Sequence, residues 1–208
     1  MSKIQGMFGK GALLVLYPIN PIPKIIKFQY NPESLTRSFQ PVNSNTGTGE
    51  NAPSETFRIT SPPIETMSLD IEIDATDKLE FPDKNPVTVS MGISPELTAL
   101  ESLLYPTSFD IITNAILASQ GMIEIVPPES PSVFLVWGLN RIVPVSITDL
   151  RIVEEAHDFN LNPIRAKVSL GLRILTYDDL PKDHPAYAIY QTYHQFKETV
   201  AALLSSTG

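Results

Sequence analysis

Residues 164 to 174 alternate between apolar and polar side chains, and this pattern limits the fold more than any other feature of the chain. Arg165, Lys167, Ser169 and Arg173 fall between the apolar positions. The apolar set is Ile164, Ala166, Val168, Leu170, Leu172 and Ile174. A period of two is typical of a β-strand that buries one face. We therefore predict one long, half-buried strand.

Proline divides the rest of the chain into short segments. There are 19 prolines against 10 glycines, which is typical of a β protein rather than a helical bundle. Apolar or alternating stretches predict further strands over residues 12–17, 25–30, 56–60, 67–75, 133–138 and 143–153. The strand 67–75 has an acidic face formed by Asp70, Glu72 and Asp74. A change of apolar parity in 143–153 predicts a β-bulge near Thr148 and Asp149.

Three segments have helical patterns. Ser94 as N-cap and Pro95 in the first turn indicate a helix that ends near Tyr105. A second helical piece is expected over residues 109–120. The third, residues 185–204, has apolar side chains every three or four residues, including Tyr190 and Phe196, and predicts an amphipathic helix about 30 Å long. Residues 40–55 contain almost no large apolar side chain and predict a mobile loop.

These elements predict a mainly β, α+β fold. The chain of 208 residues favours one β domain over residues 1–180, with a helical insertion near 95–120, followed by a C-terminal helix over 181–208. The formal net charge is -8 and there is no lysine or arginine run, which argues against nucleic acid or an anionic membrane as a partner.

The cellular setting follows from what the sequence lacks. With no cysteine, the chain has neither a disulfide framework nor a thiolate metal site. Residues 1–6 lack the apolar core of a signal peptide, and the longest apolar run, residues 12–17, is far below the roughly 20 residues that cross a bilayer. We expect a protein made in the cytoplasm, without a membrane span.

The decapeptide 154–163 gathers the most chemically active side chains. Its acidic and histidine members are Glu154, Glu155, His157 and Asp158. The favoured interpretation is a hairpin connection, in which Asp158, Asn160 and Asn162 make local hydrogen bonds. The alternatives are a hydrolase site or a metal site, although zinc sites usually have more nitrogen or sulfur ligands. We assign no catalytic, metal or cofactor residue, and expect no enzyme.

Four blocks of sequence resemble, in order, the tube-initiator baseplate proteins of contractile injection systems, the phage-tail-like devices related to the anti-feeding prophage and the Photorhabdus virulence cassette. The blocks are FQYNPESLTRS from Phe28, LESLLYP from Leu100, Trp137-Gly138 followed by VPVSIT from Val143, and LNPIRA from Leu161. The match covers roughly residues 12–177. The family-motif and interface candidates are Asn31, Pro32, Glu33, Trp137, Gly138, Asn162, Pro163 and Arg165, with Tyr190 and Phe196 of the C-terminal helix.

The resemblance implies a tail-tube-like β-barrel or sandwich that forms a hexameric ring between a spike hub and the inner tube, in contact with other baseplate proteins of a phage-tail-like particle. It implies no cofactor. Members often continue into a LysM module, whereas this sequence continues into the helix at 185–204, so the resemblance carries no expectation of peptidoglycan contact. The acidic strand 67–75 and the basic positions of 164–174 are expected to be complementary, within one subunit or between two.

A ligand- or carbohydrate-binding β-sandwich module is the rival interpretation. Such a module would use Trp137 and nearby tyrosines as a binding platform. Trp137 lies in an apolar strand among Val, Leu and Phe, which favours a place in the core instead.

Overall fold

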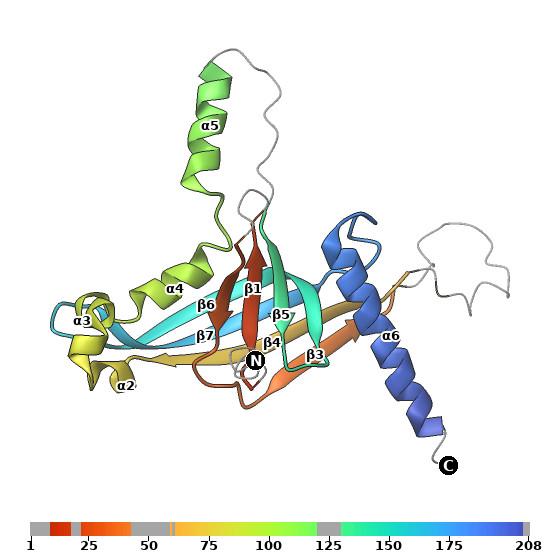
Figure 1. Ribbon diagram of the computed structural model, residues 1–208, viewed down its shortest axis with the longest axis horizontal. Helices are drawn as coiled ribbons and strands as arrows, with labels where there is room; N and C mark the ends of the chain where they lie inside the picture. Colours follow the sequence, from red (N-terminus) through yellow and green to blue (C-terminus); the bar gives the residue numbers. More distant parts are fainter. Residues whose placement is uncertain (1–8, 18–21, 43–58, 60, 120–129, 206–208) are drawn as a thin grey trace.

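The computed structural model describes residues 9–17, 22–42, 59, 61–119 and 130–205. Within these ranges the chain is a mixed α+β fold built on one antiparallel sheet of seven strands (Figure 1). The strands are β1 (Ala12–Leu16), β2 (Lys24–Lys27), β3 (Leu35–Gln40), β4 (Ile64–Asp74), β5 (Ser132–Val136), β6 (Ile142–His157) and β7 (Pro163–Ile174). Their order is β2-β1-β5-β6-β7-β4-β3. The prediction of a mainly β fold is confirmed.

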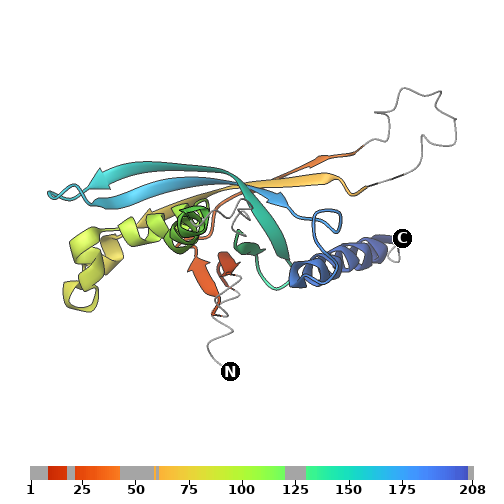
Figure 2. The ribbon, with the colours of Figure 1, turned by 90° about the horizontal axis from the view of Figure 1, so that it is seen from above.

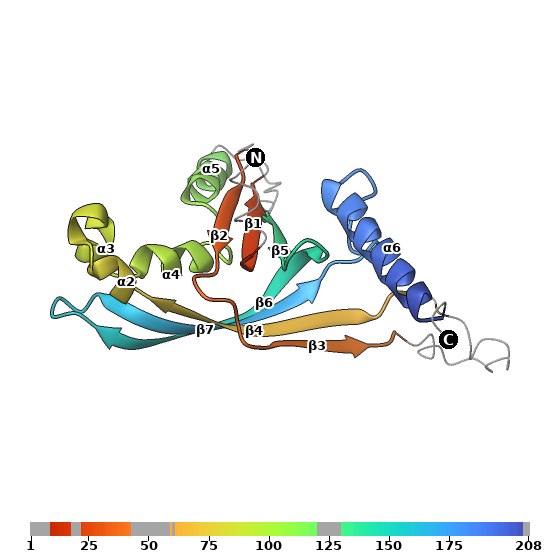
Figure 3. The ribbon, with the colours of Figure 1, turned by 60° about the horizontal axis from the view of Figure 1, so that its bottom comes forward.

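The long strand β6 holds the sheet together. Its first residues pair with β5, as in Ile142 opposite Val136, and the rest pairs with β7. The short strands β1, β2 and β5 therefore stand across the long strands β4 and β7 instead of extending them in one flat layer (Figure 3). A β-bulge interrupts the pairing of β6 with β7 between Ile147 and Asp149, as predicted, and bulges increase the local twist of a strand.

The inner faces of β7 and β4 form the centre of the core. The apolar positions of β7 from Ala166 to Ile174 are all buried, and so are Leu69, Ile71 and Ile73 of β4. Both alternations are thus confirmed. Burial of a side chain of this size stabilises the fold by about 1.5–3 kcal/mol, so these two strands contribute much of the stability.

The helices lie around this sheet. They are α2 (Thr76–Leu79), the 3-10 turn η2 (Pro82–Lys84), α3 (Pro86–Met91), α4 (Ser94–Glu101), α5 (Ser108–Ser119) and α6 (Pro185–Ser205). Leu97 and Leu100 of α4 are buried in the core. In contrast, α5 projects away from the sheet (Figure 1). No helix in the described ranges combines the length and the apolar character that a bilayer span requires.

Two predictions about α4 are wrong. Ser94 is the first helical residue, Ile93 occupies the N-cap position, and no side chain caps the helix. The N–H of Ile93 instead donates to the carbonyl of Pro163 at 2.8 Å, so a tertiary contact sets the start of α4. The helix ends at Glu101 rather than near Tyr105.

Other boundaries differ by a few residues. The strand predicted over 25–30 ends at Lys27, and the strand predicted from residue 67 begins at Ile64. β6 extends to His157 and β7 begins at Pro163, so half of the decapeptide 154–163 is strand. The predicted loop 40–55 and strand 56–60 lie almost wholly outside the described residues. The division into a domain of 1–180 and a helix of 181–208 stays a prediction.

Candidate functional site

The candidate residues lie at several places along an elongated molecule. The β6–β7 hairpin lies at one end of the long axis and α6 lies near the other, and a view from above gives the same arrangement (Figures 1 and 2). The motif beside β1 is described first, then the hairpin end and then the α6 end.

The side chain of Asn31 holds the backbone just before β1 by two hydrogen bonds. Its side-chain oxygen accepts a hydrogen bond from the N–H of Gly11 at 2.9 Å, and its amide nitrogen donates to the carbonyl of Gly9 at 3.0 Å. Pro32 is half-buried and Glu33 is exposed, and Glu33 makes no ion pair within the described ranges. Of this motif, Glu33 is the residue most available to a partner.

Asn162 and Pro163 join the hairpin to the helices beside it. The side-chain amide of Asn162 donates to the carbonyl of Ser90 at 3.2 Å, and the buried Pro163 accepts from Ile93. Gly92, between Ser90 and Ile93, has φ of 59°. A Cβ at Gly92 would lie 2.0 Å from the Pro163 carbonyl oxygen. Only glycine fits this contact.

Asp158 organises the hairpin turn. Its carboxylate accepts hydrogen bonds from the backbone N–H of Asn160 at 2.7 Å and of Asn162 at 2.9 Å, and from the Asn162 amide at 2.9 Å. The bond from the Asn162 side chain, with these backbone bonds, lowers the pKa of Asp158. The interpretation of this segment as a hairpin connection is confirmed.

The other acidic and histidine side chains of the decapeptide make separate contacts. Glu154 lies 2.9 Å from the Nε2 of His157, and Glu155 forms an ion pair with Lys167 at 2.8 Å. In the part of the chain that the structure describes, no group of three histidine or acidic side chains is placed to hold a metal ion. His184 acts at the start of α6, where its Nδ1 accepts from the N–H of Ala186 at 3.2 Å.

Arg165 joins β7 to β4. Its Nε donates to Asp74 at 2.7 Å, and Glu72 lies opposite Lys167 in the same ladder. The expected complementarity of these two strands therefore occurs within one subunit. The hydroxyl of Thr76 and, after it, Arg165 lower the pKa of Asp74.

At the other end, α6 is held to the sheet by a buried carboxylate. Glu65 of β4 is only 4% exposed and binds Arg37 of β3 at 2.6 Å and Lys197 of α6 at 2.9 Å. Arg37 also donates to the hydroxyl of Tyr193 at 3.3 Å. A buried carboxylate is tolerated only when it is paired in this way.

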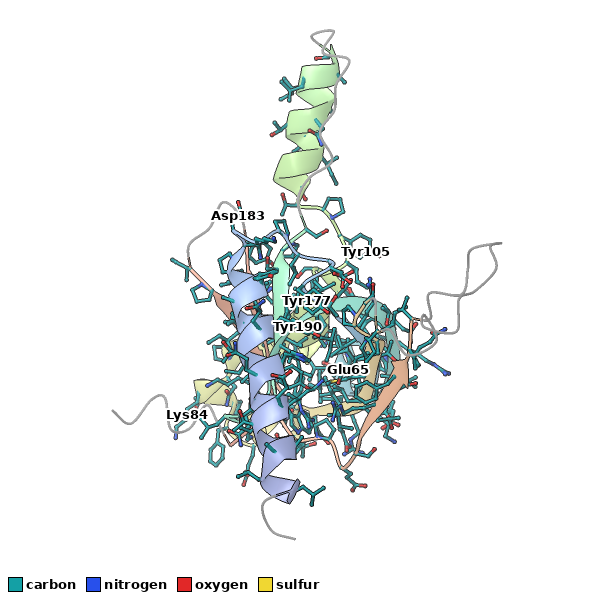
Figure 4. The ribbon with its side chains drawn as sticks, turned by 90° about the vertical axis from the view of Figure 1, so that its right-hand side faces the viewer. Glu65, Lys84, Tyr105, Tyr177, Asp183 and Tyr190 are labelled. Carbon is teal, nitrogen blue, oxygen red and sulfur yellow. The ribbon has the colours of Figure 1, made fainter. Side chains whose placement is uncertain are left out.

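Tyr190 lies on the inner side of α6. Its ring packs edge to face against Tyr177, with centroids 6.0 Å apart (Figure 4). Burial and the nearby charge of Glu65 raise the pKa of Tyr190 to about 12. Its predicted place on the apolar side of the helix is confirmed.

Sequence reasoning missed this junction. Arg37 and Lys197 are 28 and 132 residues from Glu65, so no local pattern connects them. The available signal was a glutamate directly before the alternating part of β4, at a position that faces inward in the strand.

A cleft lies between α6 and the β5–β6 turn. It has a volume of about 370 Å³ and is lined by Arg37, Trp137, Asn140, Arg141, Tyr193, Phe196, Lys197, Val200 and Ala201. Trp137 packs partly against the core, so the core interpretation holds for only part of its ring. Gly138, with φ of 72°, forms the turn beside it. Within the described ranges, no carboxylate lies within ion-pair distance of Arg141.

Exposed apolar side chains occur on the projecting elements. Phe159 and Leu161 at the hairpin turn are 95% and 80% exposed. Further exposed apolar side chains include Ile111, Ile112 and Ile116 on α5, and Phe196, Val200, Leu203 and Leu204 in the second half of α6. Apolar side chains concentrated in this way are typical of interaction surfaces.

Comparison with known proteins does not assign the chain to a family. A scan against protein-family models finds no match, and a search of curated proteins also finds none.

Proposed function

We propose that the protein is a structural subunit of a contractile injection system baseplate, which assembles into a ring that links the spike hub to the inner tube and templates tube growth. The observation that carries this proposal is the open order of the sheet, with β2 and β3 as its two edges. The four sequence blocks that resemble tube initiators are the reason for proposing a contractile injection system as the assembly to which this subunit belongs.

An edge strand needs either a partner or protection. Its outward N–H and C=O groups can pair with another chain, and lysine side chains are a common way to prevent this. β2 carries Lys24 and Lys27 at its ends. β3 has the sequence LTRSFQ, without lysine, so β3 is the edge better suited to pair with a neighbour. In a ring, β3 of one copy would meet a different surface of the next copy, and strands contributed in this way by every copy would complete the tail-tube-like barrel around a channel.

Blocking the β3 edge tests the proposal. The variant carries Thr36→Lys and Ser38→Lys, two exposed positions of β3. The control carries Gln191→Lys and Gln195→Lys, which add the same charge on the exposed side of α6. Size-exclusion chromatography with light scattering and negative-stain imaging, with the cognate hub and tube proteins, measure ring formation and tube seeding.

We expect wild type and control to form rings and to join one end of the tube, and the β3 variant to fail in both. A wild-type protein that stays monomeric and binds neither partner would overturn the proposal. Equal assembly by the variant and the control would show that β3 is not the pairing edge.

A further inference from the structure

We infer that the hairpin tip of one copy, residues 157–162, docks in the cleft beside α6 of a second copy. The contact is head to tail and joins unlike surfaces of identical chains. The inference rests on the proposed function in one respect, since it names a contact through which copies of the subunit would assemble.

The hairpin tip is an exposed apolar surface on a rigid turn. Phe159 and Leu161 are 95% and 80% exposed. The backbone N–H groups of Asn160 and Asn162 donate to the Asp158 carboxylate and hold the turn that carries both side chains. Leu161 has φ of 66°, an uncommon conformation for a residue other than glycine. A turn ordered in advance loses little conformational freedom when it binds.

The cleft has the complementary character. Trp137, Phe196 and Val200 give it apolar walls. Its charged lining consists of Arg37, Arg141 and Lys197, and Glu65 neutralises Arg37 and Lys197 in part. Arg141 has no acidic partner within the described ranges. A cationic cleft is unusual on a chain with a net charge of -8, and it suits an acidic segment that has an exposed aromatic ring.

Acidic side chains outnumber basic ones at the hairpin end, where Lys167 and Arg165 pair with Glu155 and Asp74. Glu154, Glu155 and Asp158 lie within five residues of Phe159. The side chains of Glu154 and Glu155 remain 44% and 31% exposed despite their contacts with His157 and Lys167. Opposite charges at the two surfaces would orient the approach of one copy to the next.

A hairpin tip that enters the cleft must belong to another copy. The hairpin tip and α6 lie toward opposite ends of the long axis in both views (Figures 1 and 2), so one chain cannot bring them together. A contact between unlike surfaces repeats from copy to copy and produces a closed ring or an open filament.

Cysteine cross-linking tests the contact directly, because the natural chain contains no cysteine. The full-length Phe159→Cys variant is mixed with a full-length Val200→Cys variant that carries a tag and so has a different mass. An oxidant is then added so that a disulfide can form between the two cysteines. The control replaces the first partner with Ile111→Cys, another exposed apolar position, on α5. We expect the mixed dimer of the first pair to exceed both homodimers and the control dimer several-fold. Equal yields in all mixtures would overturn the inference.

A pair of defective variants gives a second test. Phe159→Asp disrupts the apolar surface of the hairpin tip and leaves the cleft intact, whereas Val200→Glu disrupts the apolar wall of the cleft and leaves the hairpin tip intact. Both positions are exposed, and circular dichroism melts check that both variants fold. Both variants are made in the edge-blocked Thr36→Lys/Ser38→Lys protein, so that only the tip–cleft contact is measured. Each variant alone should then be monomeric, and an equal mixture should stop at dimers, because one intact tip and one intact cleft remain. Assembly of either variant alone to the same extent as the edge-blocked protein would overturn the inference.

The two proposals can fail independently. If wild type forms rings and both defective variants assemble to the same extent as the edge-blocked protein, the tip–cleft contact is refuted and the ring subunit stands. If the cross-link forms but the protein never seeds a tube, the self-contact stands and the proposed function is refuted.

Discussion

Gly92 and Gly138 both have positive φ, but only Gly92 is closed in by the backbone of another segment. A Cβ at Gly92 would lie 2.0 Å from the Pro163 carbonyl oxygen, whereas a Cβ at Gly138 would meet nothing within 4 Å. The Asn162–Pro163 motif is therefore a packing element as well as a turn signal.

Alanine at these two glycines should have unequal effects. Gly138→Ala should lower the free energy of unfolding by about 1 kcal/mol through backbone strain alone. Gly92→Ala should cost about 3 kcal/mol or more, since strain and a backbone clash combine. Urea unfolding measures both. Equal losses would mean that the hairpin moves away from Gly92 without cost.

Asn31 and Glu33 offer a second comparison within one motif. Asn31→Ala should lower the free energy of unfolding by about 1–2 kcal/mol, because two hydrogen bonds to the start of β1 are lost. Glu33→Ala should change stability by less than about 0.5 kcal/mol. Thermal unfolding checks both values. A large loss from Glu33→Ala would contradict its description as an exposed side chain without an ion pair in the described ranges.

Tyr190 predicts a loss of stability in alkali. Its pKa in the folded chain is about 12, above the value of about 10 in the unfolded chain. The contribution of protonated Tyr190 to the free energy of unfolding is complete below pH 10. It is lost as pH rises toward 12, because the tyrosine of the unfolded chain releases its proton first. Tyr190→Phe should flatten this decline, measured by unfolding at several pH values, whereas Tyr105→Phe at an exposed position should leave it unchanged.

At the scale of the element, predictability follows how local the cause is. The alternation in β4 and β7 marks the buried face directly, because each residue's environment follows from its parity. The start of α4 could not be predicted, since a carbonyl from β7 satisfies Ile93 where a serine cap was expected. The short helices α2 and α3 lacked a periodic pattern long enough to identify them.

The attachment of α6 depends on Glu65. Glu65→Ala should lower the free energy of unfolding by about 1–3 kcal/mol, because Arg37 and Lys197 lose their shared carboxylate. Hydrogen exchange should accelerate in α6 while β7 stays protected. Glu198→Ala, an exposed position on the same helix, is the control. Equal acceleration in both elements would indicate global unfolding instead of release of α6.

At the scale of the whole molecule, the candidate site was predictable only in part. The motif residues were found from sequence blocks, and Tyr190 and Phe196 from helical spacing. Their assembly into one cleft with Arg37, Trp137 and Lys197 was not, because the contributing strands and helix meet only through the order of the sheet. The hairpin turn was predicted, but the exposure of Phe159 was not.

The continuity of β6 has a mechanical consequence. One strand, bent by β-bulges, pairs first with β5 and then with β7, so tension applied between the two ends of the subunit would pass along a single backbone segment. The hydrogen bonds beside β6 would then be loaded together, parallel to the strand, rather than broken one after another. A chain built in this way is suited to resist a pull along the direction of β6.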